Sequence, residues 1–164
     1  MKRTVTSAVL QFIVLLPIHS FAQSPQLPAD TILGYEIQGI TGLMTPDDAR
    51  SALLNAGFSE KRDGEDWGKV PTATFTRDEV TVALTHLDGE IIRINETRLS
   101  RGESLDYADD VERIRAHFGK SAEAGCVEQD YGTRCGFRGA GGSAARFSAS
   151  LTPQMIFIQL SSEP

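Results

Sequence analysis

The chain has 164 residues, with 22 acidic against 16 basic side chains for a formal net charge of −6, and 40% of its residues are hydrophobic. That length and apolar content suffice for one domain with a buried core. The acidic balance argues against a nucleic-acid or anionic-lipid partner, because phosphate binding needs clustered Lys and Arg.

The first 22 residues have the three-part layout of a secretory signal peptide. Lys2 and Arg3 supply positive charge, an apolar stretch covers residues 8–18, and small residues stand at Ser20 and Ala22 before the expected cleavage. The apolar stretch is shorter than the roughly 20 residues that span a bilayer. We therefore expect export to the periplasm or the medium and no integral membrane segment. The leader holds two basic residues and no acid, so the mature chain would carry a net charge of −8.

Up to Gly57 the sequence predicts a flexible segment, a short strand and a helix. Residues 23–34 begin Pro-rich and without periodicity, which favours a flexible mature N-terminus. Residues 35–40 alternate like a short strand. A helix is predicted to begin after the N-cap Thr45, with Pro46 in its first position, and to end before Gly57.

The next part of the chain changes to the two-residue period of strands. A charged loop over residues 59–66 precedes a predicted strand over 67–76. Apolar residues alternate over 80–84, and a second apolar run covers 91–94. Between them stands Asp88-Gly89, a dipeptide typical of a type I′ hairpin turn.

The second half of the chain repeats this order of helix and hairpin. A helix with an apolar face is predicted over 106–118, and Gly119 would end it. Strand-forming residues follow over 126–137 around a turn. Residues 146–160 then predict another hairpin, with its turn at 152–154.

These elements predict a single α+β domain over residues 35–164. Two helices would pack on one face of an antiparallel meander sheet of six to eight strands. A period of about 60–65 residues indicates two helix-plus-hairpin units, 35–100 and 101–161, as in a tandem repeat. The alternative is a chance similarity between two segments of the same element order.

Both cysteines, Cys126 and Cys135, belong to the mature chain and stand nine positions apart. In an oxidising compartment an even number of cysteines predicts a disulfide. The spacing is not that of a Cys-x-x-Cys redox pair, and no histidine lies nearby in the sequence to complete a zinc site. We expect a structural disulfide.

No residue pattern in the chain predicts a catalytic, cofactor or metal site. His86 continues the apolar face of a strand, and His117 lies in the last turn of a helix, where a cationic ring suits the helix dipole. Neither is spaced from a nucleophile and an acid as in a catalytic triad. The neighbouring Asp109 and Asp110 point about 100° apart on a helix, and acids in a first turn are ordinary helix-start chemistry.

Two predicted loops have compositions that bind a cation or a phosphate in other proteins. Residues 63–66, Asp-Gly-Glu-Asp, offer oxygen ligands to a cation but lack the spacing of an EF-hand, so a solvated loop is expected. Residues 138–143 are Gly-rich but lie between predicted strands, whereas a phosphate cradle precedes a helix. A flexible hairpin loop is expected there.

Loops on a rigid sheet often carry recognition, and aromatic or arginine side chains beside them are frequent interface anchors. On this ground five residues are expected to contact a partner: Arg62, Asp66, Trp67, Tyr131 and Arg138.

The segment Gly42-Leu43-Met44-Thr45 opens the first predicted helix, and a meander and a second copy follow it. This layout, over residues 35–161, resembles the small exported α+β domains of the SmpA/OmlA outer-membrane-assembly lipoproteins and the tandem β-lactamase inhibitor proteins. The resemblance implies a non-catalytic protein that offers a sheet face or loops to another protein.

We therefore expect a soluble, exported, non-enzymatic protein that binds a protein or another cell-envelope component without a cofactor. Two other functions also fit the sequence. One is a small-ligand carrier or an enzyme whose site is assembled only in three dimensions, and the other is a structural envelope component. A deep apolar pocket containing His86 would favour the carrier or enzyme, whereas an open sheet would favour the binding protein.

Overall fold

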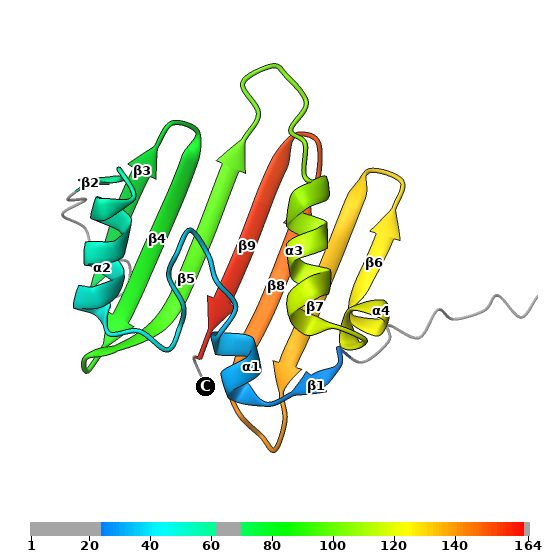
Figure 1. Cartoon of the computed structure of the whole chain (residues 1–164), viewed down its shortest axis with the longest axis horizontal. Helices are drawn as coiled ribbons and strands as arrows, with labels where there is room; N and C mark the ends of the chain where they lie inside the picture. Colours follow the sequence, from blue (N-terminus) through cyan, green and yellow to red (C-terminus); the bar gives the residue numbers. More distant parts are fainter. Residues whose placement is uncertain (1–23, 62–69, 163–164) are drawn as a thin grey trace, which may run out of the picture.

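The computed structural model describes residues 24–61 and 70–162, which form an α+β fold on one largely antiparallel sheet (Figure 1). The predicted signal peptide, residues 1–22, lies outside the described residues. No helix in the described ranges is long and apolar enough to cross a membrane. The elements in chain order are β1 (Gln26–Leu27), α1 (Ala29–Leu33), α2 (Pro46–Asn55), β2 (Ser59–Lys61), β3 (Thr72–Arg77), β4 (Val80–Leu87), β5 (Glu90–Leu99), α3 (Ala108–Phe118), α4 (Ser121–Gly125), β6 (Cys126–Gln129), β7 (Gly132–Gly139), β8 (Arg146–Leu151) and β9 (Met155–Ser161).

The predicted α+β class with a mostly antiparallel sheet is confirmed. The described part of the sheet has nine strands in the order β1-β7-β8-β9-β5-β4-β3-β2, with β6 also paired to β7. Every pair is antiparallel except β1 with β7. At the centre, β5 pairs with β9, which lies far from it in the sequence. Long-range pairing therefore joins the two halves of the chain into one sheet.

The sheet is larger than the six to eight strands predicted because two short edge strands extend it. One of them, β2, forms at the start of the predicted loop over 59–66 and pairs with β3. On α2, Arg50 Nη2 lies 2.7 Å from Glu60 Oε2, which ties this edge strand to the helix. The helices also number four in the described residues, instead of two, since α1 and α4 have only five residues each.

The N-terminal segment 23–34, predicted to be flexible, holds regular structure from Gln26 onward. The backbone N–H of Arg138 donates to the Pro25 carbonyl at 3.0 Å, and that of Ala140 donates to the Leu27 carbonyl at 2.7 Å. These bonds add β1 to the sheet edge. Ile32 of α1 is fully buried. A two-residue strand and a five-residue helix are too short to show a hydrophobic period, so no local pattern predicts them.

Residues 35–40 form a tight turn where a strand was predicted. Gln38 and Gly39 have φ values of 51° and 83°, and the backbones of Ile37 and Ile40 exchange two hydrogen bonds across the turn. Tyr35, Ile37 and Ile40 are buried. The apolar alternation therefore comes from a turn that faces the core, and not from the pleat of a strand.

Other local predictions are confirmed. At the start of α2 the Thr45 side chain accepts a hydrogen bond from the Asp48 backbone N–H at 3.2 Å. Asp88 and Gly89 have φ values of 52° and 83°, as a type I′ turn requires at both positions. The strands β8 and β9 form the predicted hairpin.

The core lies between the helices and one face of the sheet. The helices are in front of the strands in Figure 1. On α3, Phe118 stacks on Phe137 of β7 with ring centroids 4.0 Å apart and meets Phe147 of β8 edge-on at 4.9 Å. On α2, Ala49 and Leu53 are fully buried. Because side chains alternate along a strand, the remaining strand positions point to the opposite face.

Candidate functional site

Two of the five residues expected to contact a partner belong to the described part of the chain. Tyr131 is 59% exposed between β6 and β7, and Arg138 is exposed near the end of β7. They stand at opposite ends of one strand, about 23 Å apart at roughly 3.3 Å per residue, so the structure does not bring them together. Arg62, Asp66 and Trp67 lie outside the described residues.

The predicted disulfide is present. Cys126 and Cys135 are direct partners in the β6–β7 register and are bonded to each other, with Cα atoms 4.0 Å apart. Cys135 is 5% exposed and belongs to the hydrophobic core. The bond therefore fixes the β6–β7 hairpin at its core side.

Reducing this disulfide is expected to lower the free energy of unfolding by about 2.7 kcal/mol, the chain-entropy value for a loop of about 10 residues. Urea unfolding of the oxidised and reduced protein measures the difference. Two titratable thiols in the unfolded, unreduced protein would contradict the expectation, because no bridge would then exist.

The two described histidines lie against the backbone, an aromatic ring or a neighbouring strand, and the Gly-rich segment is a connection between strands. The Nε2 atom of His117 lies 2.7 Å from the Thr31 carbonyl oxygen, and its ring meets that of Tyr35 edge-on at 5.3 Å. His86 is half-buried on β4, beside an irregularity in the pairing with β5. The Gly-rich segment connects the paired strands β7 and β8 as a hairpin loop, as predicted, but the loop covers residues 140–145, because Arg138 and Gly139 belong to β7.

No metal site emerges from the geometry of the described side chains. Within residues 24–61 and 70–162, no three His, Cys, Asp or Glu side chains are grouped so that they could hold an ion. The acidic loop over 63–66, considered above as a cation ligand, lies outside these ranges.

Asp110, half of the acidic pair at the start of α3, belongs to a buried charge network formed by Glu96, Arg98 and Asp110. Arg98 lies 2.7 Å from Glu96 through Nε and 2.6 Å from Asp110 through Nη2. Glu96 is fully buried and Asp110 is 2% exposed. Arg113 also pairs with Asp110. Each carboxylate thus has a cationic partner, as buried charges require.

Hydrogen bonds extend this network toward α2. Gln38 donates from Nε2 to Glu96 Oε2 at 3.2 Å and accepts at Oε1 from Arg77, also at 3.2 Å. Arg77 donates from Nη1 to the Ala56 carbonyl at the end of α2 at 2.6 Å. Burial raises the pKa of the nearby Tyr35 hydroxyl to about 12, so this group stays neutral. The network links both long helices to the sheet.

The sheet face opposite the helices, called the open face below, has a different character. Along each strand, every second side chain points into the core, and the side chains between them form the open face. The strand register places these outward-pointing positions next to one another. Across β2–β9 these positions carry Ser, Thr, Asn, Gln, Arg, Lys and a few apolar side chains, but no Asp or Glu in the described strands. The described strands of this acidic protein therefore present one face without acids.

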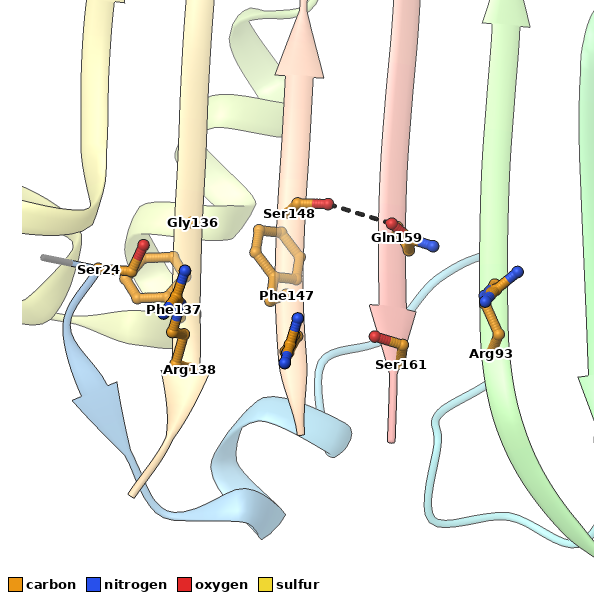
Figure 2. A pocket seen from close by; sticks show the side chains of 10 residues that line it. Ser24, Arg93, Gly136, Phe137, Arg138, Phe147, Ser148, Gln159 and Ser161 are labelled. Atoms are coloured by element: carbon orange, nitrogen blue, oxygen red, sulfur yellow. Dashed lines mark hydrogen bonds between the residues drawn. The ribbon is translucent and has the colours of Figure 1, made fainter. Parts of the chain in front are cut away.

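Arginines concentrate at one end of the open face. In the register across β7, β8, β9 and β5, Arg138 stands opposite Arg146, Arg146 opposite Ser161, and Ser161 opposite Arg93. We call Arg93, Arg138 and Arg146 the arginine row. Figure 2 shows Arg93 and Arg138 on this face, beside a hydrogen bond of 3.4 Å from Ser148 to Gln159. The row lines a pocket of about 420 Å³.

Sequence reasoning identified Arg138 but missed Arg93 and Arg146. Each stands next to an apolar core residue in its own strand, which is the local sign that it points outward. Their convergence depends on the pairing of β5 with β9 and of β9 with β8. That register joins residues too far apart in the chain for local patterns to predict.

Comparison with protein-family models, with curated proteins and with solved structures finds no match to this chain. The resemblance to the SmpA/OmlA and β-lactamase inhibitor domains therefore stays a prediction.

Proposed function

We propose that this chain is an exported, non-catalytic binding protein that contacts another protein through the open face of its sheet. One observation carries the proposal: the described helices pack on one face, while the opposite face carries polar and arginine side chains that, apart from the buried Thr85, are exposed or half-buried. Antiparallel sheets can keep one face in solvent. Broad, rigid faces of this kind suit protein recognition.

The described side chains favour binding over catalysis. The carboxylates of the buried charge network are occupied by Arg98 and Arg113, and His117 contacts a backbone carbonyl of α1. On the open face, arginine, serine and glutamine supply hydrogen-bond donors and acceptors on strands. Hydrogen bonds from such groups are enough to bind a partner protein, and binding of this kind requires no nucleophile and no proton-transfer pair.

We also propose export and a tandem origin for the fold. The disulfide supports export, because such bonds persist in oxidising compartments. The tandem origin is supported by the strand order: β2–β5 and β6–β9 each follow a long helix, and their last strands, β5 and β9, pair antiparallel. Two related units over 35–100 and 101–161 would then meet at the centre of one sheet.

Site-specific photo-crosslinking in the native cell tests the binding face. A photoreactive residue at Ser148, exposed on the open face, is expected to give a discrete adduct with a second protein. The matched control is Ser51, exposed on α2, which is expected to give none. An adduct from Ser51 alone would contradict the proposal, and so would identical adducts from both positions.

A further inference from the structure

Two arginines of the row face each other without a counter-charge among the described residues. Arg138 and Arg146 are direct cross-strand partners, so their Cβ atoms lie about 5 Å apart, and like charges in this position are destabilising. Both are exposed. In residues 24–61 and 70–162, neither guanidinium has a hydrogen bond or an ion pair, whereas Arg50, Arg98, Arg113 and Arg115 on the helix side each bind a carboxylate.

A third such arginine extends the positive charge along β7. Arg134 is exposed on the same face, four residues before Arg138, and the strand rise puts the two about 13 Å apart. It also has no ion pair among the described side chains. Between them stands Gly136, which has no side chain and forms part of the pocket wall beside the Ser24 hydroxyl. The cations are thus spread along a shallow track, not gathered around one point.

Resting on the proposed function, we propose that this track binds an acidic segment of the partner protein, whose Asp or Glu carboxylates pair with Arg134, Arg138 and Arg146. Guanidinium groups bind carboxylates through paired hydrogen bonds. In an extended segment, alternate side chains lie about 7 Å apart on one side, so carboxylates at positions i and i+4 span the distance from Arg134 to Arg138. A single phosphate is too small to reach both.

The overall negative charge of the protein does not oppose this contact. The net charge of −6 acts through solvent, where the Debye length is about 8 Å at physiological ionic strength. A carboxylate at the track lies within that distance of the arginines. No Asp or Glu shares the described open face with them. The local positive field therefore sets the sign of the interaction, and steers an acidic segment to this face.

An NMR titration with a defined probe tests the proposal. Acetylated, amidated pentaglutamate, the shortest probe with carboxylates at positions i and i+4, is added to the purified protein at physiological ionic strength, and amide shifts are followed. We expect shifts on β7 and β8, and about tenfold weaker binding in the Arg138→Gln/Arg146→Gln double variant. The control is Arg50→Gln/Arg115→Gln, which removes two exposed arginines from the helix side and is expected to leave the affinity unchanged.

Two further probes identify the ligand chemistry. Pentaglutamine is expected not to bind, and inorganic phosphate is expected to bind more weakly than pentaglutamate. The proposal is overturned if pentaglutamate does not shift β7 and β8, if the double variant binds it equally well, or if phosphate binds as tightly. In each of these cases a crosslink from Ser148 would still support the binding face, so the failure of this inference is distinguishable from that of the proposed function.

Discussion

Replacing Arg98 with methionine is expected to lower the free energy of unfolding by about 3–5 kcal/mol, the usual loss when one partner of a buried ion pair is removed. Arg98 lies against the carboxylates of Glu96 and Asp110. Asp110 would keep Arg113, but Glu96, fully buried, would keep only the Gln38 amide. A buried carboxylate without a cation is the source of the loss. Urea unfolding followed by circular dichroism measures it.

A second substitution separates this cause from a packing defect. In Arg98→Met/Glu96→Gln the buried charge is gone, while the hydrogen bond from Gln38 has an amide oxygen to accept it. We expect the double variant to regain most of the lost stability, because a buried pair replaced by neutral groups of similar size is often tolerated. If Arg98→Met alone stayed within about 1 kcal/mol of the parent, the network would contribute little to the fold.

The buried charge network also shows what the sequence could not reveal. Asp110 was interpreted as ordinary helix-start chemistry, which its position in the first turn of α3 justifies. Its burial follows from the position of α3 over the sheet, where the Arg98 side chain of β5 reaches Asp110 from the helix side. Glu96 and Arg98 stand in a strand whose apolar alternation stops at Ile94. Local patterns contain no information about which distant helix will cover those positions.

Elements with strong local signals were predictable. The cap at Thr45 and the turn at Asp88-Gly89 depend on a few neighbouring residues, and the disulfide depends on the cysteine count. By contrast, the arginine row could be predicted only with knowledge of how four strands are paired and in which register. Arg138 was chosen as a loop residue, whereas it lies within β7. The sequence therefore identified one member of the row, but neither its neighbours nor the face that they share.

Replacing Phe118 with alanine is expected to lower the free energy of unfolding by about 3–5 kcal/mol, the range for a large aromatic residue truncated in a packed core. The Phe118 ring is 5% exposed on α3. It stacks on Phe137 and meets Phe147 edge-on, so it holds the helix to β7 and β8. Its removal leaves a cavity between the helix and the sheet. Thermal and urea unfolding measure the loss.

Phe157 provides the matched control, because it is the same residue type on the other face of the sheet. It is half-buried on β9, opposite Thr97 and Ser150 in the register, and the described helices lie on the other side of the sheet (Figure 1). Phe157→Ala therefore removes less buried apolar surface and is expected to lose clearly less stability. Equal losses from the two variants would mean that the open face is covered in the folded protein. A partner could then not reach the arginine row without displacing whatever covers it, and the binding face would have to be sought elsewhere on the molecule.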